Sequence, residues 1–436
     1  MSTPTTLPPT YRSLLRVNGL PRLMLAAMLG RIGGQMWTVA LVLFALQRFH
    51  SPAIAGVTVF AGAFPGIVVS PLAGALLDRN GRVRLMMLDY SVAAVAITLI
   101  VVLATTGVLN VGLLIGIALI GSLTNPLSGA GARTLFPVMV PHHLWDRANA
   151  ADSTGFVVAA VIGAPLAAVV AGLVGRPAAL VATAAVFVAA GLSLLRMPPL
   201  PGPRARSSSR SLLGDAWAGL AHVARNPTLR GISVSIAVSN VASGLLIVVL
   251  PVLVLDHFHQ NAAVVGVLWA ISAFSGGLVA LVLGHRGTQG RERRLIVAGL
   301  LAMGLALALL AVAPDLPVVA LAMLVYGGAG GPVNVGMWSM RQRRTDPAWY
   351  GRAIAVSMSL NYLGSPIGSA VAGPLIGAGL LVAVAVAAGF AFAASAVTVL
   401  LIPGSDGEAG PPEAPRSVEV PRPAPEAEPA ALRTAR

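Results

Sequence analysis

The sequence has 436 residues, of which 56% are hydrophobic and only 10% are charged, whereas about 25% of the residues of a typical soluble domain are charged. The formal net charge is +14, but the basic residues stand singly in loops between apolar segments and form no basic face, which argues against a nucleic-acid partner. The absence of cysteine excludes disulfides, thiol catalysis and cysteine-ligated metals. A chain this apolar is predicted to be an all-α membrane protein.

Twelve apolar segments of about 20 residues are long enough to cross a bilayer core of about 30 Å. They lack the alternation with a period of two that is typical of membrane strands, which favours helices. The segments cover residues 23–46, 53–77, 85–106, 110–132, 151–174, 178–195, 230–255, 262–284, 295–313, 316–339, 353–376 and 379–402. Residues 1–22 lack the apolar core and cleavage site of a removable signal peptide, so we expect an N-terminal tail there.

The distribution of arginine predicts the orientation. Three arginines precede the first segment, 18 lie in the five loops that follow even-numbered segments and Arg230 begins the seventh segment, whereas the loops after odd-numbered segments carry only Arg48 and Arg176. Because basic residues concentrate in cytoplasmic loops, both termini are predicted to be cytoplasmic.

Composition also predicts the domain boundaries. A proline- and serine-rich stretch within residues 198–229 reads as a cytoplasmic linker between an N-terminal six-helix bundle, 23–197, and a C-terminal one, 230–402. Within the linker, residues 212–225 are predicted to form an amphipathic helix on the inner membrane surface. Residues 403–436, rich in proline, alanine and glutamate, are expected to be a disordered cytoplasmic tail.

The two bundles are predicted to be repeats. A glycine, a proline and a second glycine recur with the same spacing in the fifth and eleventh segments, 201 residues apart. They are Gly163, Pro165 and Gly172, and then Gly364, Pro366 and Gly373. A repeat with an even number of spans gives parallel halves, and each proline with its glycine is expected to kink its helix.

A charged loop separates the second and third segments. Its residues Gly74, Asp78, Arg79, Gly81 and Arg82 stand at fixed offsets. The charges belong at the membrane edge, because a charge at mid-bilayer costs about 2.5 to 3.5 kcal/mol on insertion scales. Gly74 lets a neighbouring helix approach and Gly81 permits a tight turn with positive φ. A general excess of arginine in cytoplasmic loops explains the arginines but not the spaced glycines and aspartate.

This pattern resembles the signature between the second and third helices of the major facilitator superfamily. Residues 133–141 with 148–150, and Gln342 with Arg343 after the tenth segment, are similar to the branch that includes siderophore and macrolide exporters. The resemblance implies twelve transmembrane helices in two parallel six-helix bundles and alternating access in the cytoplasmic membrane. By the same resemblance, Asp78 is expected to pair with the facing half and to latch the outward-open state, while Arg79 and Arg82 hold the loop.

Polar side chains inside the segments are the default functional candidates of a membrane protein. An offset of 209 residues relates Arg31 to Asn240 and Asn125 to Asn334, so the first, fourth, seventh and tenth segments carry polar residues at matching places. The resemblance implies that these four helices line the central path, where the four side chains could hydrogen-bond a substrate.

Two further residues join the predicted path. Gln35 lies one turn after Arg31 on the same face. Trp338 is a candidate aromatic wall, although ordinary packing or an interface belt is the more common explanation of an aromatic residue in a membrane helix. The alternative for Arg31 is structural, because its long side chain can snorkel toward the inner surface.

Transport driven by protons would need an acidic side chain that takes up a proton. The candidates are Asp89 and Asp152, near the inner ends of their segments. Burial among apolar helices can bring a carboxyl into the working pH range, so proton antiport through either is a hypothesis. The antiporter signature of the superfamily is matched only in part, since Ala164 precedes Pro165.

We therefore predict a monomeric secondary transporter that exports a small, amphipathic organic compound, with no cofactor, no metal and no enzymatic activity. No phosphate-binding loop is present, which argues against ATP-driven transport. The alternatives are an uncoupled facilitator or lipid flippase, and a non-transporting receptor or scaffold on the same fold.

Overall fold

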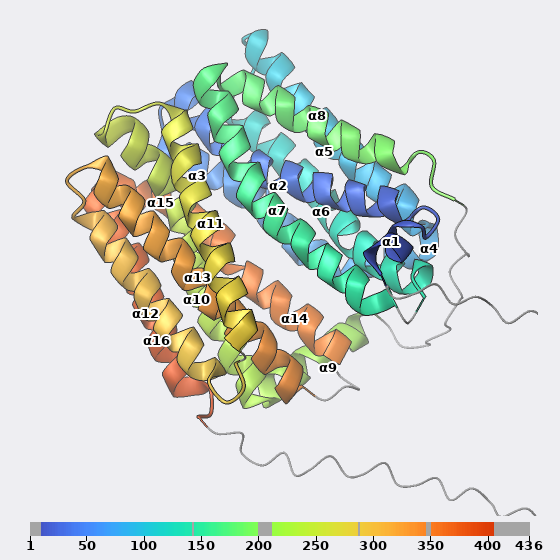
Figure 1. Ribbon diagram of the computed structural model, residues 1–436. Helices are drawn as coiled ribbons and strands as arrows, with labels where there is room; N and C mark the ends of the chain where they lie inside the picture. The colour runs from blue at the N-terminus through green and yellow to red at the C-terminus, as the bar shows by residue number, and fades with distance from the viewer. Residues whose placement is uncertain (1–9, 142–143, 199–211, 287, 346–349, 405–436) are drawn as a thin grey trace, which may run out of the picture.

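The computed structural model describes residues 10–141, 144–198, 212–286, 288–345 and 350–404, and all of their regular structure is helical (Figure 1). The N-terminal half contains α1 (Tyr11–Leu15), α2 (Leu20–Phe49), α3 (Pro52–Ala61), α4 (Phe64–Asn80), α5 (Arg82–Thr105), α6 (Val111–Met139), α7 (Trp145–Leu173) and α8 (Arg176–Leu194). The C-terminal half contains α9 (Leu212–Arg225), α10 (Pro227–Val252), the π-helical turn η2 (Leu253–His257), α11 (Ala262–Arg286), α12 (Glu292–Ala311), α13 (Leu316–Arg344), α14 (Tyr350–Tyr362), α15 (Gly364–Ala378) and α16 (Leu380–Leu401).

The predicted all-α membrane fold is confirmed. Among the described residues, eleven helical stretches are long and apolar enough to cross a membrane. The eleventh predicted segment is missing from that count because it is divided at Leu363 into α14, of 13 residues, and α15, of 15 residues.

Two predicted continuous segments are in fact interrupted, each four residues before a proline. The second segment breaks after Ala61, where α3 ends, and Pro65 follows in the first turn of α4. The eleventh breaks after Tyr362, where α14 ends, ahead of Pro366. Proline has no N–H to bond to the carbonyl four residues earlier. By contrast, α7 runs on through Pro165, so a proline alone does not end a helix here.

Each half packs its first helix against its fifth helix through a glycine. A methyl carbon built on Gly163 of α7 would lie 2.9 Å from the carbonyl oxygen of Ile32 in α2. One built on Gly364 of α15 would lie 2.0 Å from the carbonyl oxygen of Ala237 in α10. The equivalent glycines of the two halves therefore make the same close backbone contact, as the repeat implies.

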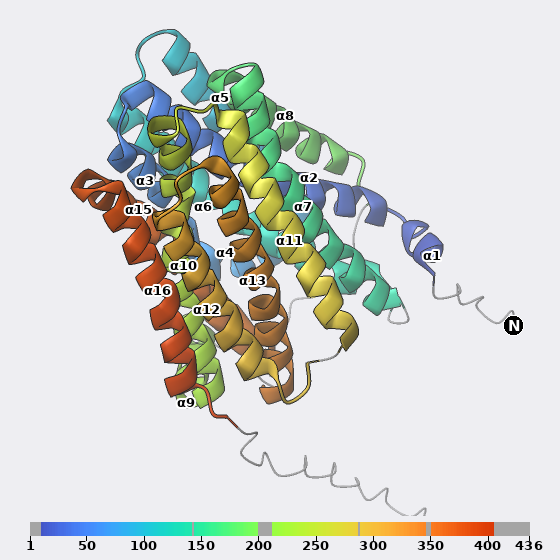
Figure 2. The same cartoon turned by 60° about the vertical axis from the view of Figure 1, so that its left-hand side comes forward.

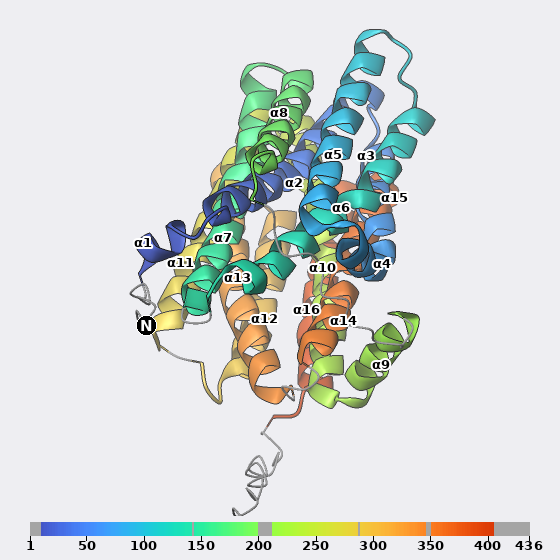
Figure 3. The same cartoon turned by 90° about the vertical axis from the view of Figure 1, so that its right-hand side faces the viewer.

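The two bundles meet at one end and diverge toward the other (Figures 1 and 2). We call the end with loops at 50–51, 174–175 and 379 the arginine-poor end, and the end with α9 and the α4–α5 turn the arginine-rich end. At the arginine-poor end, Gly373 of α15 lies against Ala53 of α3, since a methyl carbon on Gly373 would be 2.1 Å from the Cα of Ala53. Viewed from the side, α12 and α16 point away from the arginine-rich end of α2 (Figure 3).

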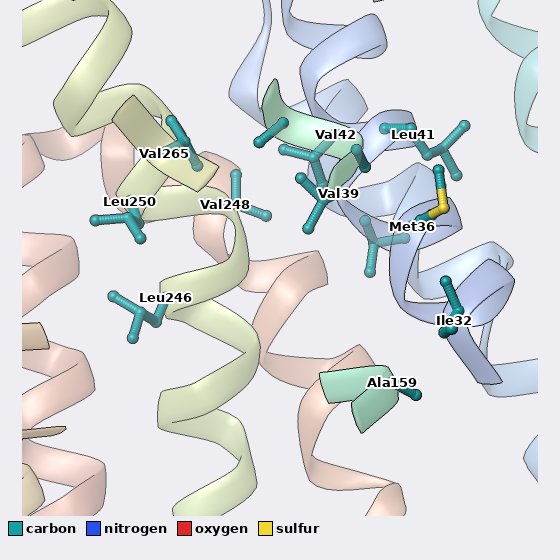
Figure 4. Close-up of a cluster of buried hydrophobic side chains, with 14 of the residues drawn as sticks. Ile32, Met36, Val39, Leu41, Val42, Ala159, Leu246, Val248, Leu250 and Val265 are labelled. Atoms are coloured by element: carbon teal, nitrogen blue, oxygen red, sulfur yellow. The ribbon is translucent and has the colours of Figure 1, made fainter. Parts of the chain in front are cut away.

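An apolar layer joins the bundles near this closed end. Val39 and Val42 of α2 and Val248 of α10 are buried in one core cluster. Figure 4 shows Val39 and Val42 pointing from α2 toward Val248. The first helices of the two halves thus meet through aliphatic side chains, and the structure is closed at the arginine-poor end.

The linker contains the predicted helix. α9 begins at Leu212 and ends at Arg225, and its Val223 packs against Leu229, Val356 and Leu360. This cluster attaches α9 to α14, which is the half of the interrupted eleventh segment nearer the arginine-rich end. The location of α9 on the membrane surface stays a prediction.

Candidate functional site

An ion pair joins the first and fifth helices of the N-terminal half. Nη2 of Arg31 in α2 lies 2.5 Å from Oδ1 of Asp152 in α7, and Nη1 donates to the backbone oxygen of Asp152 at 3.1 Å. The two side chains are 16% and 14% exposed. The sequence assigned Arg31 to the substrate path and Asp152 to proton coupling, whereas the structure brings them together in one group.

Glycines of α7 make room for this pair. A methyl carbon on Gly155 would lie 3.1 Å from Nη1 of Arg31, and one on Gly163 would lie 2.6 Å from Cβ of Gln35. The small residues allow α7 to approach α2 closely, so that the arginine reaches the acid across the helix seam. Pairing also reduces the cost of a guanidinium inside the membrane.

Phe156 completes the group and was not found from the sequence. The Cζ of Arg31 lies 3.6 Å from the ring centroid of Phe156, and the Cζ of Arg133 in α6 lies 4.9 Å from it. The ring remains 40% exposed. Because Phe156 follows Asp152 by four residues, it lies on the same helical face, which is the signal that could have identified it.

A cavity of about 220 Å³ adjoins the ion pair. Apart from Arg31, Asp152 and Thr154, its lining carries only apolar or small side chains. The lining residues are Met24, Leu25, Met28, Arg31, Ala151, Asp152, Thr154, Gly155 and Val158. The cavity thus combines an apolar body with one charged corner, the arrangement expected for an amphipathic ligand.

The predicted ring of four polar residues is not one hydrogen-bonded ring. Asn125 and Asn334, like Gln35, have exposed side chains, and Asn334 donates to the carbonyl of Gly330 on its own helix at 3.1 Å. Asn240 instead donates to the backbone oxygen of Asn361 in α14 at 2.8 Å. Gln35, Asn125 and Asn334 are therefore exposed, whereas the amide of Asn240 ties α10 to α14.

A buried arginine in the C-terminal half was missed by the sequence reasoning. Arg341 of α13 is fully buried, and its Nη2 donates to Oγ of Ser357 in α14 at 2.9 Å. Oγ of Ser357 also lies 2.6 Å from Oγ of Ser233 in α10. Trp338, the candidate aromatic wall, is half-buried, with its ring 5.7 Å from Cζ of Arg341.

The repeat relates this cluster to the N-terminal site. Ser357 stands 201 residues after Phe156, so the equivalent position of each fifth helix contacts an arginine of the fourth helix in its half, Arg133 or Arg341. The two halves therefore share a layout but differ in chemistry, with an exposed aromatic ring in one and a buried hydroxyl in the other.

Asp89, the other candidate proton site, is not a member of the ion pair that Arg31 forms with Asp152. It is 4% exposed in α5, and the polar side chains that face it are Thr124 and Ser128 of α6. It does not line the cavity beside Arg31.

The charged loop is described in part. Gly81 has a φ of 87° and joins α4 to α5, a conformation that favours glycine, and Arg82 donates to the carbonyl of Thr134 at 3.0 Å. The surroundings of Gly74 and the side chains of Asp78 and Arg79 lie outside the described part of the structure, so the latch stays a prediction.

The equivalent loop of the second half also turns at a glycine. Gly290 has a φ of 73°, and Glu292, the first residue of α12, forms an ion pair with Arg343 of α13. The second loop therefore carries an acid five residues later than the position equivalent to Asp78, and its described ion pair lies within one bundle.

Comparison with known families decides the identity. The sequence model of the Major Facilitator Superfamily matches residues 23–369 and 232–434. The chain belongs to the Major Facilitator Superfamily. This confirms the resemblance of its charged loop, and the protein is a multi-pass membrane transporter of small molecules.

Relatives in this superfamily match most of the chain. An uncharacterized MFS-type transporter of Sinorhizobium fredii is 39% identical over 396 residues, which are 90% of this chain and 97% of the relative. The multidrug efflux pump Tap of Mycolicibacterium fortuitum is 26% identical and covers 81% of this chain and 88% of its own. Macrolide efflux protein A of Streptococcus pyogenes is 22% identical, with coverages of 76% and 82%.

A solved transporter has the same fold. The crystal structure of a point mutant of the nucleoside transporter NupG superposes with a TM-score of 0.73, covering 88% of this chain and 100% of its own, at 14% sequence identity. A likeness at this identity concerns the fold alone.

Proposed function

We propose that this transporter exports a small, amphipathic organic compound across the cytoplasmic membrane by alternating access, with both termini in the cytoplasm. The observation that carries the proposal is the apolar cavity with the Arg31–Asp152 pair at its corner, which suits an amphipathic ligand. The bundles diverge toward the arginine-rich end, which faces the cytoplasm in this proposal, so a compound can enter from inside the cell. The likeness to Tap and to a macrolide efflux protein over most of the chain supports export over uptake.

If the protein is an exporter, cells that express it should accumulate less of its substrate. Cells that express the protein are expected to accumulate at least one member of a panel of fluorescent amphipathic compounds severalfold less than cells without it, and to survive higher doses of it. The panel should be screened in a strain that lacks its main endogenous pumps. Higher accumulation in the expressing cells would instead indicate uptake, and equal accumulation across the whole panel would favour a scaffold.

We further propose that Asp152 carries the proton in an antiport cycle. Protonation of Asp152 removes the negative partner of Arg31 and frees the guanidinium, so one proton changes a contact between α2 and α7. Asp89 suits this role less well, because the polar side chains that face it are hydroxyls of α6.

The proton proposal is tested by an imposed pH gradient. In proteoliposomes, export by the wild type is expected to rise severalfold when the trans side is acidified, and Asp152→Asn should lose this response because its amide cannot take up the proton. Asp89→Asn serves as the matched acid-to-amide control and should keep it. A normal response in Asp152→Asn, or a lost response in Asp89→Asn alone, would assign the proton elsewhere.

A further inference from the structure

The guanidinium of Arg31 occupies a site that is built for a cation. Asp152 supplies a carboxylate oxygen at 2.5 Å and a backbone oxygen at 3.1 Å, and Phe156 supplies its ring at 3.6 Å. A carboxylate, a carbonyl and an aromatic face are the groups that bind amidinium and ammonium ions. All three belong to consecutive turns of α7, whereas the cation itself comes from α2.

This site opens into the apolar cavity. Arg31 and Asp152 both line the cavity of about 220 Å³, together with Met24, Met28 and Val158. Methionine side chains are flexible and polarizable and adapt to aromatic or aliphatic groups of different shape. An organic cation could therefore place its charged group on Asp152 and its apolar body in the cavity.

We propose that Arg31 is a tethered occupant of a subsite for an organic cation, and that an amidine or amine of the transported compound replaces it on Asp152 and Phe156. The inference rests on the proposed function, since it assigns the substrate class of the same path. Asp152 then has three competing ligands, which are a proton, Arg31 and the substrate cation. The displaced guanidinium has a long, flexible stem that can extend toward the arginine-rich surface.

Arg133 does not fill the subsite itself. Its Cζ lies 4.9 Å from the ring of Phe156, but among the described residues Asp152 forms its ion pair with Arg31. Arg133 is exposed at this point of α6. It therefore competes for the ring but leaves the carboxylate to Arg31 or to a ligand.

Three probes of almost the same shape separate charge from size. Benzamidine is a cation that resembles the arginine head group, benzamide is neutral, and benzoate is an anion. Their affinities are measured with the purified full-length protein in lipid nanodiscs, from the concentration dependence of the thermal unfolding midpoint. The wild type is compared with Arg31→Ala, which empties the subsite, and with Arg31→Ala/Asp152→Asn, which also removes its charge.

Benzamidine is expected to bind Arg31→Ala at least tenfold more tightly than it binds the wild type. Among the three probes, Arg31→Ala should bind benzamidine most tightly, benzamide less tightly and benzoate least tightly. The preference for the cation should disappear in Arg31→Ala/Asp152→Asn. Arg31→Ala/Phe156→Leu should bind benzamidine severalfold more weakly than Arg31→Ala, because the aromatic face is lost.

The proposal is overturned if Arg31→Ala binds benzamidine no better than the wild type does, or if benzoate is the preferred probe. If Arg31→Ala folds only when the site is filled, the yield of folded protein is compared after purification in the presence of each probe. Folded protein is then expected with benzamidine and not with benzoate. These readouts do not depend on transport. Charge-selective binding without any export in cells would therefore contradict the export proposal alone.

Discussion

Replacing Arg31 and Asp152 together by leucine is expected to leave a stable protein that no longer exports. The side chains are largely buried, and removing one member of such a pair leaves the other charge uncompensated. Asp152→Leu alone should therefore lower the free energy of unfolding by about 3 kcal/mol, whereas the double variant should return to within about 1 kcal/mol of the wild type, because two apolar side chains replace two charges. Export should fall at least tenfold in both variants and in Arg31→Leu alone.

This comparison separates a structural role of the pair from a transport role. Stability is read from the thermal unfolding midpoint in detergent and export from accumulation in cells. Arg48→Leu is the matched control, since it removes an exposed arginine from the other end of α2, and it should change neither quantity. An Arg31→Leu/Asp152→Leu protein that exports normally would show that the pair only supports the fold.

Gly373→Val is expected to open the arginine-poor end and to reduce export at least tenfold. A Cβ on Gly373 would lie 2.1 Å from the Cα of Ala53, and one on Gly56 would lie 2.0 Å from the carbonyl oxygen of Ser369. Both obstacles are backbone atoms, which cannot rotate away as a side chain would. The valine therefore separates α3 from α15 and shifts the population toward the state that is open at this end.

The absence of native cysteine makes this shift directly measurable. A single cysteine is introduced as Gln35→Cys, because Gln35 is exposed and precedes the buried Val39 along α2. A membrane-impermeant maleimide added outside the cell should label this cysteine in Gly373→Val but not in the parent. Gly377→Val is the matched control, because a Cβ there would meet no atom within 4 Å. Equal labelling of Gly373→Val and the parent would mean that this contact does not close the path.

The helices could be predicted well from the sequence, because membrane spans are apolar and the loops between them are charged, a difference that shows in short stretches of sequence. The boundaries of α9 and the turn at Gly81 follow from amphipathicity and from glycine at a helix junction. The interruption at Ala61 was missed, and the one at Tyr362 was expected only as a kink at Pro366. Pro65 and Pro366 act on carbonyls four residues away, whereas Pro165 does not end α7.

The site was harder to predict because it depends on contacts between distant segments. Arg31 and Asp152 were each found as polar residues in apolar helices, but their pairing requires the close approach of α2 and α7 at Gly163. Arg341 was missed because an arginine near the end of an apolar segment has the same local sequence signature as one in a cytoplasmic loop. Its side chain is buried and reaches Ser357 of α14, a contact between segments that the local sequence does not show.

The most direct test of the proposed mechanism is transport by the purified protein in proteoliposomes, with the flux of an organic cation and the counterflow of protons recorded together. We expect the wild type to exchange the cation for protons, and Arg31→Leu/Asp152→Leu to show neither flux while remaining folded. A double variant that exchanges cation and protons at the rate of the wild type would contradict the assignment of the Arg31–Asp152 pair to the transport path.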